Sequence, residues 1–451
     1  MKERKHMNRS QAFLKEIETL SLSPLPAAVT ARIRRSLLDY LAVTAAGAAF
    51  QADKLEKYQA FAQPEEGAFT AIGMNRKLVM KEAVFLNGLN GHALDYDDGT
   101  NSGIIHLGSP IFSVLLPLAQ RYDIGLEKML QAAVLGYEAS YTLAVSIQPA
   151  HKLMGYHATG TCGVIGASLA AAYMLDFSEE ERFQTFAAAC VASSGMLKVL
   201  DDGSELKPYN VAKSALLALT ALQLAKAGFK GHADPLGGGR GFFKMMTGQE
   251  DIELKPVLLN GTWAVQKSYI KPYASCRYTH PAVEAAIAFR RKGIRPEDVE
   301  KITVRTYSLA VHGHDHREIP GSYSAKMSIP YSVAAGLMFG KAGLAEFSEE
   351  QAAEDDILQL TEKVFVEADE AFSQAFPAMQ TAVLTLLTRD GRSFEKRVDF
   401  PKGEPENPLS EEEFRERYDA LTAYGGLSAE ESARMYEAVY APEMTVRKLL
   451  G

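Results

Sequence analysis

Cysteine is scarce in this chain: only Cys162, Cys190 and Cys276 occur among 451 residues. The number is odd, and none of the three stands in a Cys-x-x-Cys pair or another ligand spacing. A disulfide framework and an iron–sulfur cluster are therefore not indicated. We expect a soluble protein of a reducing, cytoplasmic compartment.

Long apolar runs are missing as well, and so is a surplus of basic residues. No stretch approaches the ~18 apolar residues of a membrane span, and the charged start at residues 1–7 is not followed by the apolar core of a secretory signal. The formal net charge of −8 disfavours nucleic acid and anionic membranes as partners. A small anionic ligand remains open, because it responds to the local field of its pocket.

Helical periodicity dominates residues 25–261. Apolar or small residues recur three and four positions apart, which places one face of each segment in a core. This spacing is clear in Ile33, Leu37, Tyr40, Leu41 and Thr44, and it predicts further helices over residues 115–122, 126–147, 163–175 and 211–227. A chain of this length exceeds one compact core, so we expect two domains.

The pattern changes near residue 267. A helix is predicted over residues 282–292, a strand begins at Ile302, and a hairpin turns at Asp390-Gly391, with two or three helices between the strands. Beyond residue 408, Ser and Glu at capping-box spacing indicate helices again. We therefore predict a mainly α fold, in which a large all-helical domain (residues 1–266 and 405–451) carries an inserted, smaller α+β lid domain (residues 267–404).

The most informative stretch for chemistry is residues 87–110. Asp95, Asp97 and Asp98 stand where a helix should give way to a loop, and His106 follows a short glycine-containing segment. Carboxylates beside a histidine are a plausible acid/base group. A solvated loop with an Asx cap is the alternative that the spacing alone leaves open.

This stretch, Asn87-Gly-x-x-x-His-Ala-Leu-Asp-Tyr-Asp-Asp with a histidine soon after, resembles the signature of the MmgE/PrpD family. Further segments similar to that family follow in order, namely those around Leu25, Gly155-Tyr-His157, Lys207, Lys271 to His280, and Ser328-Ile-Pro-Tyr331. The resemblance implies a two-domain fold with the active site between helical domain and lid, usually a homodimer, and no metal, flavin or nucleotide cofactor.

Carried over position by position, the resemblance implies two sets of site residues. The catalytic set is Asp95, His106, His157, Lys207, Lys271 and Tyr331, and the substrate-binding set is Thr100, Cys276, Arg277 and His280. Lysines pair with substrate carboxylates, histidines move protons, and an aspartate orients a histidine. The start of the helix at Thr279-His280-Pro281 offers free backbone N–H groups to a carboxylate.

Two positions depart from relatives of the decarboxylase type, which carry threonine at Gly99 and histidine at Cys276. Three hypotheses follow: a lyase acting on a small polycarboxylic acid, an epimerase of a dicarboxylic amino or imino acid on the same scaffold, and a non-catalytic binding protein for small acids.

A second histidine cluster, His312-Gly-His314-Asp-His316, has the residue types of a metal site. All its ligands lie in one short loop of the predicted lid, with no distant partner apparent, so we expect no metal there. For the same reason we expect His314 to be dispensable.

Overall fold

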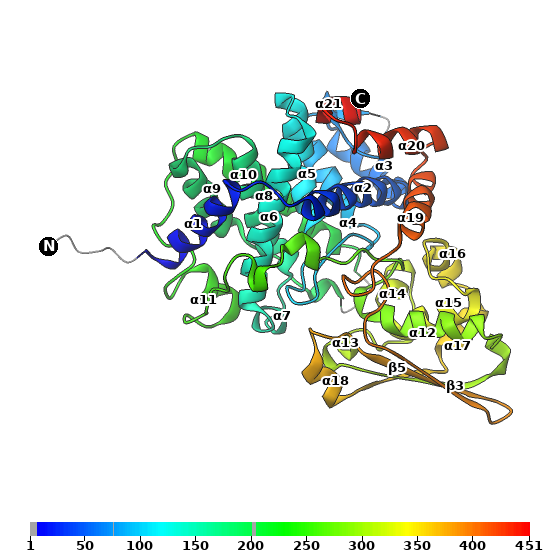
Figure 1. Cartoon of the computed structure of the whole chain (residues 1–451). Coiled ribbons are helices and arrows are strands. Elements are labelled where there is room, and N and C mark those ends of the chain that lie inside the picture. The colour runs from blue at the N-terminus through cyan, green and yellow to red at the C-terminus, as the bar shows by residue number, and fades with distance from the viewer. Residues whose placement is uncertain (1–6, 75, 201–203) are drawn as a thin grey trace.

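The computed structural model describes residues 7–74, 76–200 and 204–451, so the charged segment 1–6 lies outside it. Figure 1 shows a large helical body and, at its lower right, a smaller lobe with a sheet. The helical body comprises α1 (Arg9–Ser21), α2 (Ala27–Phe50), α3 (Ala52–Ala62), β1 (Glu66–Thr70), β2 (Lys77–Leu78), α4 (Met80–His92), α5 (Gly108–Tyr122), α6 (Leu126–Ile147), α7 (Ala150–Leu153), α8 (Ala158–Met174), α9 (Glu179–Ala192), α10 (Lys207–Lys226), α11 (Phe242–Thr247), α19 (Glu411–Tyr424), α20 (Ala429–Ala438) and α21 (Val446–Leu450).

The smaller lobe runs from α12 to β6. Its elements are α12 (His280–Arg291), β3 (Val299–Thr306), α13 (Ser308–Val311), α14 (Ser322–Met327), α15 (Ile329–Phe339), α16 (Glu349–Ala352), α17 (Asp355–Thr361), β4 (Val364–Ala368), α18 (Glu370–Ala375), β5 (Ala382–Thr388) and β6 (Ser393–Val398). The predicted mainly α fold with a smaller α+β part is confirmed. The domain limits at residues 266 and 405 remain a prediction.

The helices expected from periodicity are present. The prediction for residues 126–147 coincides with α6, whereas α5, α8 and α10 each begin four or more residues before the predicted start. Those early turns contain glycine, proline or threonine, at Gly108, Pro110, Thr159, Gly160 and Pro208, which are poor helix formers by propensity. Tertiary packing extends the helices over them, and the added turns carry residues of the site described below.

Helices α6 and α8 pack closely at the centre of the body because they face each other with glycine. A Cβ atom on Gly166 would lie 1.8 Å from Ser140 Oγ and 2.5 Å from the carbonyl oxygen of Gly136. Small residues at such crossings let two backbones approach, and this contact fixes where α8, which begins beside the site, can lie.

The sheet of the smaller lobe has the order β4-β3-β5-β6, with β3 parallel to β4 and the other pairs antiparallel. The hairpin β5–β6 turns at Asp390-Gly391, as predicted, and Gly391 takes a φ of 85°. Strand β4 was not predicted. It is five residues long and mostly exposed, so its sequence lacks the alternation of a half-buried strand.

After β6 the chain returns to the helical body through α19, whose Ser410–Glu413 capping box is present as predicted. Arg417 of α19 forms an ion pair with buried Asp39 of α2. Its guanidinium also donates to the carbonyl oxygens of Tyr96 (3.0 Å) and Lys271 (2.6 Å). One side chain thus ties α2, the loop after α4 and the segment before α12 together.

Within the described ranges, no helix combines the length and the apolar character that a membrane crossing needs.

We predict that Gly166→Ala lowers the free energy of unfolding by roughly 1–3 kcal/mol, because the added methyl group has no room between α6 and α8. Gly125→Ala is the matched control, since a Cβ at Gly125 meets nothing within 4 Å. Urea denaturation measures both variants. Equal stability of the two would contradict the close approach of these helices.

Candidate active site

The loop that follows α4 concentrates acidic side chains inside the protein. Asp95 is 4% exposed, Asp97 2% and Asp98 3%. Asp98 accepts hydrogen bonds from Gly108 N (2.8 Å) and Tyr137 Oη (2.7 Å), which fasten the loop to α5 and α6. Burial raises the pKa of Asp98 to about 6. Asp98 therefore anchors the loop, whereas the side chains of Asp95 and Asp97 contact the lysines and histidines described next.

Asp95 holds two ammonium groups from distant parts of the chain. Its Oδ1 lies 2.7 Å from Lys207 Nζ, at the start of α10, and 3.2 Å from Lys271 Nζ, in the segment that leads to α12. Burial by itself raises the pKa of Asp95, but the charges of Lys207 and Lys271 outweigh it and bring the pKa well below its usual value. The carboxylate is thus ionised and shared by two cations.

The backbone of Asp95 is also unusual. Its φ is 49°, in the left-handed region that residues other than glycine seldom occupy. This conformation lets the backbone carbonyl of Asp95 accept a hydrogen bond from Lys271 Nζ while the side chain faces Lys207. Strain of this kind persists only where surrounding contacts impose it, and it is common at functional sites.

Three histidines stand beside this ion group. His92 Nδ1 contacts Asp97 at 2.8 Å, and Asp97 also accepts from Ser109 Oγ at 2.7 Å. The ring of His106 lies 4.5 Å from that of His92 and 6.4 Å from that of His157, measured between centroids. His106 Nδ1 faces the Asp98 carbonyl at 2.9 Å, and its Nε2 lies 3.6 Å from Asp95 Oδ1.

His157 precedes the first turn of α8, and its Nδ1 is buried without a hydrogen-bond partner among the described residues. Burial, reinforced by the positive charge of Lys207, lowers its pKa well below the usual value. A neutral imidazole with a free nitrogen is therefore present at neutral pH, which suits a proton acceptor.

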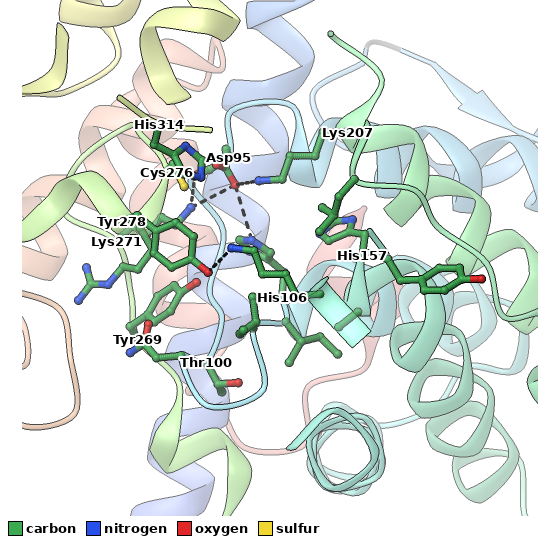
Figure 2. Close-up of a pocket in the computed structure, with 18 residues that line it drawn as sticks. Asp95, Thr100, His106, His157, Lys207, Tyr269, Lys271, Cys276, Tyr278 and His314 are labelled. Carbon is green, nitrogen blue, oxygen red and sulfur yellow. Dashed lines mark hydrogen bonds and ion pairs between the residues drawn. The ribbon is translucent and has the colours of Figure 1, made fainter. Parts of the chain in front are cut away.

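Asp95, His106, His157, Lys207 and Lys271 line one cavity between the helical body and the segment before α12. Figure 2 shows Lys207 and His157 on one side of this cavity and Lys271, Cys276, Tyr278 and His314 on the other. Of the residues expected from the sequence, eight line it: Asp95, Thr100, His106, His157, Lys207, Lys271, Cys276 and Arg277. The structure thus brings together residues up to 182 positions apart in the chain, from 95 to 277.

Arg277 reaches the cavity wall but is already occupied. It forms a buried ion pair with Glu404 and donates to His280 Nδ1 (2.7 Å) and to the carbonyl oxygens of Pro401 (3.3 Å) and Lys402 (3.2 Å). Its Nε also donates to Glu404 at 2.8 Å. Because its donors are engaged in this way, Arg277 joins the segment before α12 to the segment after β6.

Tyr331 and His280 lie outside the cavity. Tyr331 is buried in α15 and donates its hydroxyl to the Glu346 carbonyl at 2.9 Å. His280 begins α12, as predicted, but its ring packs on Tyr273 and accepts from Arg277. The Tyr331 and His280 side chains are therefore directed to other parts of the protein and not to the cavity. A sequence motif alone does not give the direction of a side chain.

Lys152, Tyr269, Tyr278 and His314 are among the cavity residues that were not predicted. His314 was expected to be dispensable, and this stays a prediction. Its buried ring lines the cavity, and its Nδ1 faces the Met327 carbonyl at 2.8 Å. Tyr269 explains the departure at Gly99, because a Cβ there would lie 2.5 Å from the tyrosine hydroxyl.

Four acidic and imidazole side chains, His92, Asp95, Asp97 and His106, have ligand atoms within 4.8 Å of one another. They fit a divalent cation poorly. Asp95 already lies beside two ammonium groups that would repel a metal ion, and Asp97 is bonded to His92 and Ser109. In the second histidine cluster, His316 Nε2 faces Ser324 and His314 Nδ1 faces the Met327 carbonyl.

The fold and the site define a class: a helical protein with an α+β lobe, whose shared cavity combines buried lysines with histidines able to move a proton. Residues 11–255 match the MmgE/PrpD N-terminal domain, and residues 273–440 match the MmgE/PrpD C-terminal domain. The chain belongs to the MmgE/PrpD family.

Several curated relatives are similar to this chain. Cis-aconitate decarboxylase of Mus musculus is 24% identical over 91% of this chain and 86% of its own length. The Homo sapiens protein of the same name is 23% identical over 91% and 87%, respectively. A 2-methylcitrate dehydratase of Salmonella typhimurium is 28% identical over 136 residues, which is 28% of each chain.

We predict that His92 stays neutral down to about pH 5, because burial lowers its pKa to about 4. An unfolded histidine takes up its proton near pH 6.5, so between these values the unfolded state binds more protons. The stability that neutral His92 contributes is thus fully present above pH 6.5 and is lost as the pH falls toward 4. NMR of histidine-labelled protein, with His92→Gln for assignment, measures the titration. A midpoint near 6.5 would contradict the burial of His92, whose effect on the pKa outweighs the opposite effect of Asp97.

Proposed function

We propose that this protein is a lyase that removes carbon dioxide or water from a small polycarboxylic acid without a cofactor. The observation that carries the proposal is the charge of the cavity. Among the described residues, Lys152, Lys207 and Lys271 line it against a single carboxylate, Asp95, while the fourth lining cation, Arg277, is neutralised by Glu404. Such a lining attracts an acid with several carboxylates.

The relatives support the same class of substrate. Those that span most of the chain are named for decarboxylation of cis-aconitate, and the partial match is named for dehydration of 2-methylcitrate. Both names denote loss of a small group from a tricarboxylic acid. The departures at Gly99 and Cys276 lie in the cavity or beside it, so we leave the particular acid open between these two classes.

The residues suit the two reactions in similar ways. In decarboxylation, the bond to one carboxylate breaks, its electron pair stays on the carbon skeleton, and a proton is then added there. In dehydration, a base takes the proton beside a carboxylate, and hydroxide leaves with a proton. We assign the binding of a substrate carboxylate to Lys207 and Lys271, and proton transfer to His157 and His106. Asp95 orients His106. Thr100 and Cys276 would contact the substrate, whereas Tyr331 and His280 support the walls.

Turnover of a panel of acids tests the proposal. We expect the purified protein to consume cis-aconitate or 2-methylcitrate, with release of carbon dioxide or water. Deuterium uptake from solvent into iminodisuccinate, with nothing eliminated, would replace the lyase by the epimerase. Binding of these acids without any turnover would instead favour a non-catalytic binding protein.

We predict that His157→Ala and Lys207→Ala each lower kcat by about 10²- to 10⁴-fold, the usual loss when a general acid or base or a transition-state charge is removed. Lys207→Ala should also raise KM, because a carboxylate loses its ammonium partner. Exposed Lys81 provides the control variant Lys81→Ala. Circular dichroism verifies the fold, and near-normal kcat/KM in both site variants would refute the assigned roles.

We also propose a homodimer built on the helical body. Large apolar side chains stay exposed there, including Val191 (88%) and Met245 (53%), which line one surface hollow. Covering such a patch by a second copy would remove it from water. Light scattering should report twice the mass of the 49.2 kDa chain at micromolar concentration. A monomer under these conditions would remove this proposal.

A further inference from the structure

Lys152 is a cation of the cavity without an anionic partner among the described residues. Its Nζ donates to Tyr278 Oη at 2.7 Å and lies 4.2 Å from the centroid of the same ring. No carboxylate of the described residues lies within ion-pair distance of it. Lys207 and Lys271, in contrast, share the carboxylate of Asp95.

The protein holds Lys152 in place from two sides. Its backbone N–H donates to Gln148 Oε1 (3.2 Å), and Gln148 Nε2 donates to the Gly103 carbonyl (3.2 Å) in the loop that carries His106. The preceding residue, His151, contacts Thr161 Oγ1 of α8 at 2.9 Å. The ammonium group is therefore part of a built wall and not a loose surface side chain.

Tyr278 comes from the opposite part of the molecule. It lies in the short turn before α12, and its ring is packed edge-on against His314 at 5.3 Å and Tyr307 at 5.8 Å. Lys152 belongs to the segment that matches the N-terminal family domain, and Tyr278 to the segment that matches the C-terminal one. The contact between them thus spans the boundary of the two parts at the cavity.

We infer that Lys152 and Tyr278 form a second anion subsite of this cavity, which binds a carboxylate of the substrate away from the reacting end held by Lys207 and Lys271. This inference rests on the proposed function and specifies its substrate class, an acid with carboxylates at two separated positions. Partial burial lowers the pKa of Lys152 to about 8, so the group is mainly charged at neutral pH.

The physical reason is the uncompensated charge. A partly buried ammonium group that only a phenol contacts gains a strong, charge-assisted hydrogen bond when a carboxylate enters. The Tyr278 hydroxyl then donates to the same carboxylate, because the ammonium group occupies its acceptor side. With an acid that lacks the second carboxylate, Lys152 would keep only its contact with Tyr278. The cavity would therefore bind that acid more weakly.

Calorimetric titration with two unreactive acids tests the subsite. Tricarballylate has three carboxylates on a three-carbon chain, and butyrate has the same three-carbon chain with a single terminal carboxylate. We expect wild-type protein to prefer tricarballylate, and Lys152→Met to weaken tricarballylate by about 10-fold or more, the usual effect of losing one charge-assisted contact. The preference for tricarballylate over butyrate should shrink by about the same factor, and Lys152→Arg should restore part of it. Tyr278→Phe should weaken tricarballylate less than Lys152→Met does.

Lys81→Met, which removes an exposed lysine of α4, is the matched control for net charge. If Lys152→Met keeps both the affinity and the preference of the wild type, the subsite is wrong while the proposed lyase stands. If Lys152→Met weakens both acids equally, Lys152 acts only through the general field or the fold, and the subsite is again wrong. If wild-type protein neither binds these acids nor converts cis-aconitate or 2-methylcitrate, the proposed function fails together with the subsite.

Discussion

The structure depends on one buried carboxylate, that of Asp95. An ionised group removed from water has to be paired, and losing either partner of such a pair is strongly destabilising. Here the partners come from α10 and from the segment before α12, so pairing brings the helical body and the smaller lobe to one point. The left-handed backbone of Asp95 and the contact of Arg417 with the Lys271 carbonyl serve the same arrangement.

Around that point the charges separate into two groups with different chemistry. Asp97 is bonded to His92 and lies 3.2 Å from His106, so the histidine side of the site holds a buried carboxylate. Among the described residues, the lysine side carries more positive charge than Asp95 balances. A neutral imidazole next to an excess of ammonium groups is what proton transfer beside a carboxylate requires, because the developing negative charge meets fixed cations.

Periodicity and capping were sufficient to predict several helices of the body, such as α2, α6 and α19, the hairpin at Gly391 and the smaller α+β lobe, because these depend on local spacing. The short exposed strand β4 lacked that signal. Eight expected site residues do meet in the cavity, but a motif gives positions and not directions, so Tyr331 and His280 were placed there wrongly. Lys152 and His314 were missed because only the tertiary fold carries α7 and the loop after α13 to the cavity wall.

The most direct test of this account is a structure of the protein with an unreactive tricarboxylic acid bound. The account predicts that one carboxylate lies within about 3.2 Å of both Lys207 Nζ and Lys271 Nζ, the range of charge-assisted hydrogen bonds, with the ligand carbon chain against His157. A ligand bound elsewhere, with the contacts among Asp95, Lys207 and Lys271 untouched, would contradict it.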